Sequence, residues 1–391
     1  MGVFVPNTHV RLPAWLVVLL LLLLAACSSP GTRGQRPATS VAVSPSRRPV
    51  VDALPRAPGL VWTPGKLPDA LIRTAMRLPA VAAAVVVANG TAWLPTPPGG
   101  QGTSGMAIPI DVSAADPNRY AATVLTAPPE LARLVAGQVA LATDSARLRR
   151  LQVGASLTLQ GTSLRVAAIV PDAAIGNAEM FVTPADAQRL GIPPNRYLLI
   201  RPRSLAAWPH IADRLKQSVP TDLPLRVRAP GTARSLRQAD SVLAPLMEKL
   251  RFGEFAAKPN ATSAGYLTID PRWQAAHLMT VTVPILGSVT CNRRFIPVLQ
   301  SALQAVVESG LQGLIHREDY GGCFAPRLIP GLIGQSISHH AYGSAIDLNA
   351  AANPLGQLPH QDPRLVGLFA RFGFTWGGDW LVPDGMHFES R

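Results

Sequence analysis

The sequence has few charged residues for its length of 391 residues, and lysine is nearly absent. Charged residues make up 15% of the chain and hydrophobic residues 48%, so most of it is expected to be globular. This length favours two or more domains. The formal net charge is +13, but arginine carries nearly all of the positive charge and forms no long run. Nucleic-acid binding is typical of a clustered basic stripe, so we expect no nucleic-acid partner. Attraction to anionic wall polymers or lipid head groups is the expected effect of this charge.

Cysteine is equally scarce, with three in the whole chain. No pair has the close CxxC spacing of structural zinc sites, which argues against a zinc ribbon. Cys27 lies near the N-terminus, and Cys291 and Cys323 lie far downstream. In an exported protein such an even pair predicts a disulfide, worth about 3–4 kcal/mol in the chain-entropy model. The alternative is two free, buried thiols.

An apolar run rich in leucine extends from Leu12 to Ala26. It is too short for a comfortable membrane span and is typical of a signal-peptide core. The run ends in Leu24-Ala25-Ala26-Cys27, which resembles the lipobox of bacterial lipoproteins. The resemblance implies cleavage before Cys27, lipid attachment to its sulfur, and an exported protein anchored to the outer face of the cell membrane. An ordinary signal peptide that holds a cysteine is the alternative.

The remaining chain divides by composition into a tether, an accessory domain, a connector and a last domain. Residues 28–66 are rich in Pro, Ser, Arg and Gly, which predicts a flexible tether. Residues 67–230 predict a mixed α+β domain that binds or positions a protein partner, since no catalytic cluster is visible there. Its order of elements resembles the extracytoplasmic core domain of bacterial ABC-type permeases of the lipoprotein-export class. Residues 231–274 are interpreted as a connector.

Several elements of the accessory domain are predicted individually. Apolar residues alternate with polar ones on both sides of Gly161, which predicts a hairpin. Thr183 and Pro184 are typical of a helix start, and Gly191 of the matching stop. We also expect strands at 197–200 and 225–228 and a helix over 205–219.

The last domain, from residue 275, begins with apolar residues at helical spacing over 297–309. Further on, His340 and Asp347 lie seven residues apart. That is too far for neighbouring turns of one helix and suits two ligands on adjacent strands joined by a tight turn at Gly343. Zinc binds imidazole nitrogen and carboxylate oxygen, and a catalytic site offers three protein ligands and one open position. His387 can complete a His/Asp/His set.

Three further residues lie close to these candidates in the sequence. Asp384 lies three residues before His387, near enough for its carboxylate to reach a water on the metal without binding the metal. His339 is adjacent to His340, and only the spacing selects His340 as the ligand. Asp379 is either a partner of a ligand histidine or an exposed loop residue.

The pattern Ser-x-His-x-x-Gly-x-Ala-x-Asp followed by Asp-x-x-His-Phe resembles the D-alanyl-D-alanine carboxypeptidase family of zinc peptidases. That family includes vancomycin-resistance D,D-peptidases and phage endolysins that cut L-alanyl-D-glutamate bonds, and the resemblance covers residues 280–391. It implies Zn²⁺ at His340, Asp347 and His387, with Asp384 as the catalytic carboxylate. It further implies that Ser338 hydrogen-bonds substrate or a group around the ligands, and that Arg327 binds substrate or the oxyanion. The carboxypeptidase branch usually has Glu where this chain has Asp384, so the scissile bond stays open.

The sequence therefore predicts an α+β protein whose C-terminal domain is a small antiparallel-sheet zinc peptidase with flanking helices, preceded by a separate mixed domain. The expected function is hydrolysis of peptide bonds in the stem peptides of peptidoglycan. The alternative is a non-catalytic wall-binding or scaffold lipoprotein with a structural zinc site. Each site residue also has a simpler interpretation, as a turn cap for Asp347 or as surface residues for Asp384 and Arg327.

Overall fold

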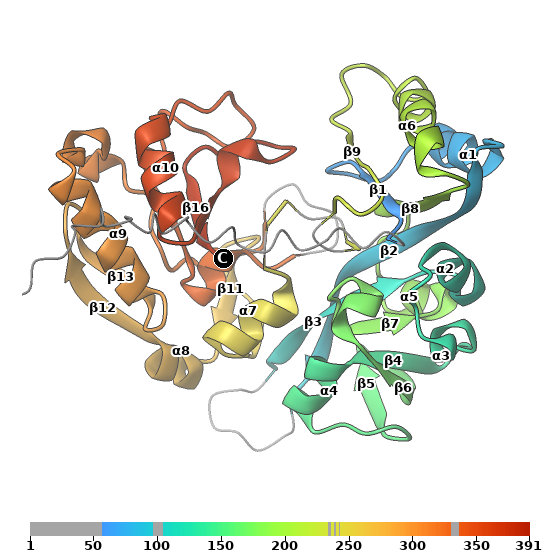
Figure 1. Ribbon diagram of the computed structural model, residues 1–391. Helices are drawn as coiled ribbons and strands as arrows, with labels where there is room; N and C mark the ends of the chain where they lie inside the picture. The colour runs from blue at the N-terminus through green and yellow to red at the C-terminus, as the bar shows by residue number, and fades with distance from the viewer. Residues whose placement is uncertain (1–56, 97–104, 234–235, 238–239, 242, 330–335) are drawn as a thin grey trace, which may run out of the picture. The chain divides into compact units, whose positions relative to one another are not determined.

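A computed structural model describes residues 57–96, 105–233, 236–237, 240–241, 243–329 and 336–391 (Figure 1). The described residues all lie in the second of two units of the chain, Val51–Arg391. The predicted signal segment and the lipidation site Cys27 lie outside the described residues. Within the described ranges, no helix combines the length and the apolar character that a membrane crossing requires.

A large mixed sheet forms the first part of the second unit, with strand order β5-β6-β4-β7-β3-β2-β8-β1-β9 and with β10 and β11 attached through β3. The pairs β3–β7 and β4–β6 are parallel, and the other pairs are antiparallel. The strands are β1 Gly59–Trp62, β2 Val81–Pro95, β3 Ala107–Ala114, β4 Gln138–Ala142, β5 Ser156–Leu159, β6 Thr162–Val170, β7 Met180–Val182, β8 Tyr197–Pro202, β9 Arg226–Arg228, β10 Ala257–Pro259 and β11 Leu267–Ile269.

Short helices accompany this sheet, and several of them begin at a proline, whose fixed φ suits the first helical turn. The helices are α1 Asp69–Arg77, α2 Pro117–Thr123, α3 Pro129–Ala132, α4 Thr143–Arg149, α5 Pro184–Arg189, α6 Trp208–Lys216 and α7 Pro245–Phe252. The predicted hairpin is β5–β6, and Thr183 caps α5 by accepting a hydrogen bond from the Asp186 amide. These local predictions are confirmed because periodicity and capping are written in neighbouring residues.

The predicted tether extends too far along the chain, and this is a correction. Residues 28–66 were expected to be flexible, but β1 is a buried strand inside the sheet, between β8 and β9. Leu60 and Trp62 are 1% and 3% exposed. A run of only four apolar residues beside Pro58 and Pro64 carries no detectable period, although both of its faces are buried.

The C-terminal part contains a two-stranded hairpin, β12–β13, and a three-stranded antiparallel sheet of order β14-β16-β15. Its helix α9 confirms the helix predicted over 297–309, and its buried face includes Leu299, Leu303 and Val306. The α+β class is therefore confirmed. The elements are α8 Pro271–His277, β12 Leu278–Val283, β13 Gly287–Asn292, α9 Ile296–Glu308, η5 His339–Tyr342, β14 Ala345–Asp347, α10 Pro363–Arg371, β15 Phe374–Trp376 and β16 His387–Ser390.

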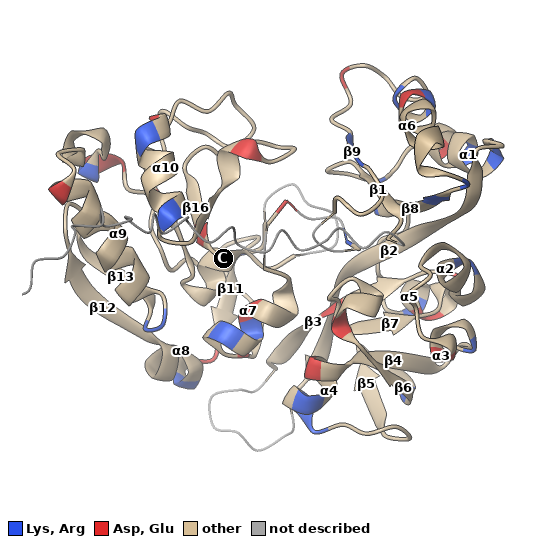
Figure 2. Ribbon diagram, viewed as in Figure 1, with Lys and Arg blue, Asp and Glu red and all other residues tan. Residues whose placement is uncertain are grey.

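The predicted connector contains regular elements and buried charges. Its helix α7 carries both acidic and basic residues (Figure 2). The Lys249 ammonium lies 2.7 Å from a Glu179 oxygen and 3.2 Å from a Glu254 oxygen, and Arg149 pairs with both carboxylates. Burial alone would raise the pKa of Glu179, but Lys249 and Arg149 outweigh it and lower that pKa. These ion pairs therefore bind α7 and Glu254 firmly to the part of the chain that forms the large sheet.

We expect Glu179→Gln to destabilise the protein by about 3 kcal/mol at pH 7, because the buried cations Lys249 and Arg149 would then share Glu254 as their one remaining carboxylate partner. A carboxyl group whose pKa is lowered by folding stabilises the folded protein at pH values above its unfolded pKa of about 4.3. That stabilisation is lost as the pH falls through the pKa of the folded state. The stability difference between wild type and variant is therefore constant near neutrality and narrows in acid. Thermal unfolding from pH 7 to pH 3 measures it. Glu130→Gln, at an exposed position, is the matched control and is expected to stay within about 0.5 kcal/mol of wild type.

Candidate metal centre

His340 lies in a short 3-10 helix, η5, rather than on a strand as the sequence predicted. Ser338 begins this helix, and its hydroxyl accepts a hydrogen bond from the His340 amide at 3.3 Å. Gly343 ends it with a φ of 66°, and a Cβ there would lie 2.7 Å from the Asn292 nitrogen. A capping serine and a left-handed glycine only five residues apart favour one tight helical turn. The chain then enters β14, which ends at Asp347.

The pairing of β14 with β16 brings the third predicted ligand to the first two. Asp347 is directly opposite His387 in the antiparallel register. Side chains of directly opposed residues lie on the same face of a sheet. Because side chains alternate along a strand, Phe388 points into the core while Glu389 shares the face of His387.

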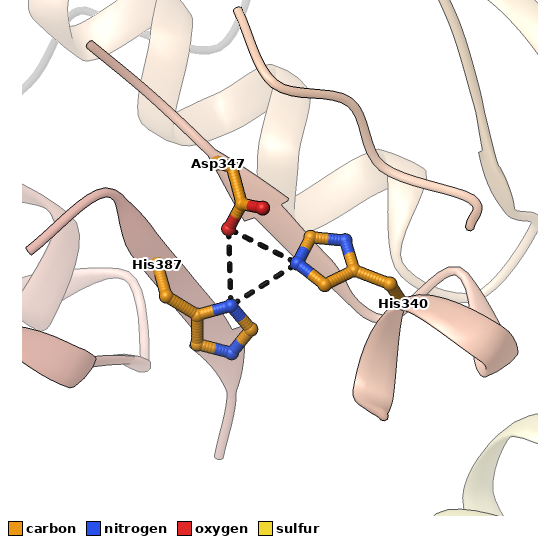
Figure 3. A group of neighbouring side chains, drawn as sticks. All are labelled: His340, Asp347 and His387. Atoms are coloured by element: carbon orange, nitrogen blue, oxygen red, sulfur yellow. Dashed lines mark hydrogen bonds and ion pairs between the residues drawn. The ribbon is translucent and has the colours of Figure 1, made fainter. Parts of the chain in front are cut away.

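The three side chains converge on one point (Figure 3). His340 Nε2 lies 3.0 Å from Asp347 Oδ1 and 3.1 Å from His387 Nδ1, and the last two atoms are 3.1 Å apart. All three residues are buried, His340 being 1% exposed. Tetrahedral zinc with ordinary bond lengths spaces its ligand atoms about 3.3 Å apart, so the set already has nearly the required dimensions.

The hydrogen bond made by the other nitrogen of each imidazole determines whether the inward-facing nitrogen carries a proton or a lone pair. His340 Nδ1 is 2.9 Å from the Cys323 carbonyl oxygen, and His387 Nε2 is 3.2 Å from Glu389 Oε2. Oxygen acceptors require both of those nitrogens to donate, so a neutral ring turns a lone pair toward Asp347 in each case. Two imidazole lone pairs and a carboxylate oxygen within about 3 Å repel one another unless a cation lies between them. The donor set therefore fits a divalent metal such as Zn²⁺.

Electrostatics keep the carboxylate ligand ionised. Burial by itself would raise the pKa of Asp347, but without a metal the positive charge and the N–H groups of the His340 and His387 rings hold that pKa well below its usual range. A bound cation would supply the same positive charge once the rings turn their lone pairs inward. Arg327 adds positive charge, with Nη2 3.6 Å from Asp347 Oδ2. At neutral pH Asp347 is thus available as a metal ligand.

The other predicted site residues lie around this centre. Asp384 is half-buried, and its Oδ1 has no hydrogen-bond partner among the described residues. Burial raises its pKa, the charge of Asp347 adds to this, and His387 and Arg327 oppose it. The loop that carries Asp384 lies so close to Gly377 that a Cβ there would be 2.7 Å from the Asp384 carbonyl oxygen. Ser338 is buried as the N-cap of η5, so it stabilises the helical turn that carries His340.

Three charged groups near the ligands were not predicted to belong to the site. His339, considered only as an alternative ligand, has Nδ1 2.8 Å from Glu389 Oε2 and 3.5 Å from Glu248 Oε1. Burial alone would lower its pKa, but the two carboxylates raise it to about 9. Glu389 carried one signal, since it lies two residues after His387 on a strand. Glu248, on α7, carried none.

Asp379, Trp376 and Trp380 lie in the segment that precedes Asp384 in the chain. Asp379 is exposed, which agrees with the loop interpretation. The Trp380 ring lies 5.2 Å from the His387 ring. Trp376 and Trp380 both line a cavity of about 240 Å³. The histidines His316 and His360 lie outside the centre and are exposed.

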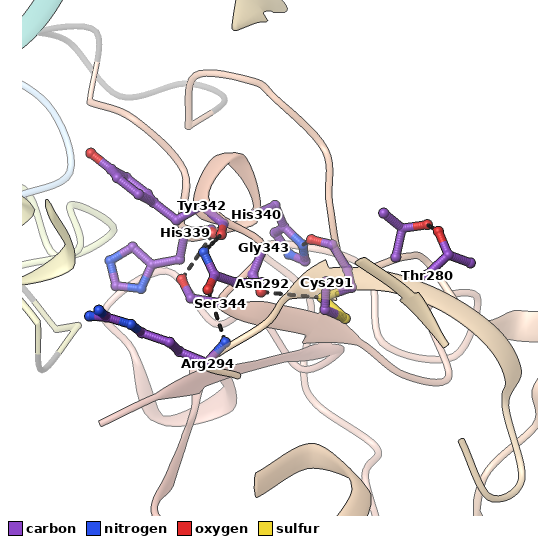
Figure 4. The surroundings of a disulfide bond; sticks show 11 residues. Thr280, Cys291, Asn292, Arg294, His339, His340, Tyr342, Gly343 and Ser344 are labelled. Atoms are coloured by element: carbon purple, nitrogen blue, oxygen red, sulfur yellow. Dashed lines mark hydrogen bonds between the residues drawn. A yellow bond between two sulfur atoms is a disulfide. The ribbon is translucent and has the colours of Figure 1, made fainter. Parts of the chain in front are cut away.

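The predicted disulfide is present. Cys291 on β13 is bonded to Cys323, with a Cα–Cα distance of 5.5 Å (Figure 4). The bridge is adjacent to the three candidate ligands, because the Cys323 carbonyl oxygen accepts the hydrogen bond from His340 Nδ1. Such a bond is typical of proteins outside the cytoplasm, which supports an extracytoplasmic location.

Residues 333–390 match the family model described as D-alanyl-D-alanine carboxypeptidase. The segment 333–390 is therefore of the D-alanyl-D-alanine carboxypeptidase type, as the motif resemblance indicated. The three converging residues all lie within the matched segment. No curated protein matches the chain.

Solved structures show weaker similarity. The extracellular domain of the noncanonic ABC-type transporter YknZ from Gram-positive bacteria is 12% identical, with a TM-score of 0.32, over 44% of this chain and 98% of that one. The periplasmic region of MacB from Actinobacillus actinomycetemcomitans is 8% identical, with a TM-score of 0.32, over 46% and 92%. A permease-protein domain from Porphyromonas gingivalis is 13% identical, with a TM-score of 0.30, over 49% and 95%. TM-scores this low do not establish that this chain shares the fold of those proteins.

The ligand set predicts that His340→Ala and His387→Ala each abolish stoichiometric zinc binding, because two remaining ligands cannot hold the ion against dilution and competing buffer. Elemental analysis of the purified, dialysed chain measures the zinc content per molecule. His316→Ala removes an exposed histidine and is expected to keep the wild-type content. Retention of one zinc per chain in either ligand variant would contradict the assignment.

Proposed function

We propose that the chain is a zinc metallopeptidase that hydrolyses peptide bonds in the stem peptides of peptidoglycan. The observation that carries the proposal is the convergence of His340, Asp347 and His387 inside a domain of the D-alanyl-D-alanine carboxypeptidase family. A structural zinc site normally has four protein ligands, whereas three protein ligands and an open position are typical of a catalytic one.

Asp384 is the proposed general base. When bound, the metal supplies positive charge that acidifies water and polarises a carbonyl group. Asp384 has a carboxylate oxygen with no partner among the described residues, and it lies within the electrostatic reach of His387 and Asp347. In the proposed reaction this carboxylate takes a proton from the attacking water and delivers it to the amine that leaves when the peptide bond breaks.

Arg327 is the proposed binding group for negative charge. Its side chain is partly exposed, at 24%, and its guanidinium approaches Asp347 at 3.6 Å, longer than a hydrogen bond. This leaves donors free for a substrate carboxylate or for the oxyanion that develops at the scissile carbonyl. Ser338 acts indirectly in this scheme, by capping the helix that carries His340.

The location of the enzyme is also part of the proposal. Lipid attachment at Cys27 would hold the chain on the outer face of the cell membrane, within reach of the wall. Residues 67–230 would contact a protein partner. An anchored, partner-bound peptidase would restrict hydrolysis to chosen parts of the envelope.

The central test is incubation of the full chain with purified peptidoglycan and with soluble muropeptides, followed by mass spectrometry. Loss of a terminal D-alanine identifies a carboxypeptidase, and freed stem peptides identify an L-alanyl-D-glutamate type of endopeptidase. Either product is expected to disappear with a zinc chelator and to return when zinc is added. A chain that binds zinc and the wall but releases nothing would instead be the scaffold lipoprotein of the alternative hypothesis.

Replacement of Asp384 separates catalysis from metal binding. Asp384→Asn keeps the shape of the side chain but cannot accept the proton, so we expect hydrolysis to fall about 10²- to 10⁴-fold with zinc content near wild type. Rates of muropeptide cleavage and zinc content are measured on the same samples. Asp379→Asn changes an exposed carboxylate a few residues away and is expected to leave both unchanged. Wild-type turnover in Asp384→Asn would show that another group is the base.

A further inference from the structure

Glu248 is a fully buried carboxylate that belongs to no part of the matched family segment. It lies on α7, at 0% exposure, in the stretch that the sequence indicated as a connector. Its Oε2 accepts a hydrogen bond from Ser344 Oγ at 2.8 Å, and its Oε1 lies 3.5 Å from His339 Nδ1. A buried acidic side chain is costly unless its polar atoms have partners, so the location of Glu248 next to η5 requires an explanation.

A continuous series of contacts leads from Glu248 to the metal ligands. His339 Nδ1 lies between two carboxylates, Glu248 and Glu389, and is 2.8 Å from Glu389 Oε2. The same Glu389 oxygen accepts from His387 Nε2 at 3.2 Å. Ser241 Oγ donates to the other Glu389 oxygen at 2.6 Å. Glu389 is therefore fixed by partners at both oxygens, and its position determines how the His387 ring is turned.

Acidic side chains and histidines alternate along this series. Glu248 and Glu389 are acidic, His339 lies between them, and His387 lies at the end next to Asp347. Without Glu248, Glu389 would be the remaining carboxylate at His339 Nδ1, and the other ring nitrogen would keep only Ser241 Oγ, at 3.5 Å. Ligand histidines depend on such outer partners for their ring orientation.

We propose that Glu248 is a positioning residue of the metal centre, which acts through His339 and Glu389 to hold the His387 ring with Nδ1 toward the other two ligand atoms. The inference rests on the proposed metal-binding function and extends it to a helix outside the family segment. It also links the site to the large sheet, because the next residue, Lys249, is bound to Glu179.

The test is Glu248→Gln in the full chain, with zinc affinity measured by competition against a chromogenic chelator. The amide oxygen can still accept from Ser344, but the amide nitrogen then places a donor opposite the donor on His339. We expect zinc affinity to fall about 10-fold, the lower end of the 10- to 100-fold range for outer partners of a ligand. Glu389→Gln, which changes the direct partner of His387, is expected to weaken zinc at least as much.

Glu254→Gln is the matched control. Glu254 is also a largely buried acid close to α7, but it pairs with Lys249 and Arg149 and not with His339. It is expected to lower thermal stability while zinc affinity stays at the wild-type value. Ser344→Ala, a milder change that removes the donor to Glu248, is expected to weaken zinc a few-fold and remains informative if Glu248→Gln folds poorly. Circular dichroism checks folding in every variant.

The outcomes separate this inference from the proposed function. Wild-type zinc affinity in both Glu248→Gln and Ser344→Ala overturns the positioning role, even if the wild-type chain cleaves muropeptides. Weakened zinc in both variants, with Glu254→Gln unchanged, supports it even if the wild-type chain cleaves nothing, which would overturn only the peptidase proposal. A wild-type chain that binds no zinc overturns both.

Discussion

Three electron pairs aimed at one buried point are the constraint on which the C-terminal domain depends. Each imidazole is forced into this orientation by an oxygen on its far side, the Cys323 carbonyl for His340 and the Glu389 carboxylate for His387. The strand pairing that sets Asp347 opposite His387 supplies the third donor. Such an arrangement is unfavourable on its own and becomes favourable when a cation neutralises it, so the fold holds the site in a geometry prepared for its metal.

The convergence of His340, Asp347 and His387 could be predicted from the sequence, because the motif is defined by residue types, spacing and order. The hairpin over Gly161, the helix α9 and the disulfide could be predicted for similar reasons, since periodicity, capping and cysteine pairing are local or compositional signals. The conformation around His340 could not, because a spacing of seven residues is compatible with more than one backbone path. A serine cap and Gly343 select the 3-10 turn. β1 was missed because four residues are too few to show a period.

Glu248 could not be predicted because its role arises only in three dimensions. It contacts Ser344, which is 96 residues away in the chain, and no local pattern marks such a pair. Neighbouring residues on a helix point in different directions, and α7 uses this to hold Glu248 under the metal centre and Lys249 against Glu179. The segment that the sequence indicated as a connector thus contains a helix that contacts both the large sheet and the C-terminal part.

The bond between Cys291 and Cys323 has a consequence for when the centre can be assembled. The peptide group that orients the first ligand belongs to one of the bridged cysteines. In a reducing compartment the bridge is absent, and the loop bearing that carbonyl is held to β13 only by backbone hydrogen bonding, from the Phe324 amide to the Thr290 carbonyl at 3.1 Å. Metal binding would then be weaker before export than after it. The chain would become able to hold its metal only on the oxidising side of the membrane.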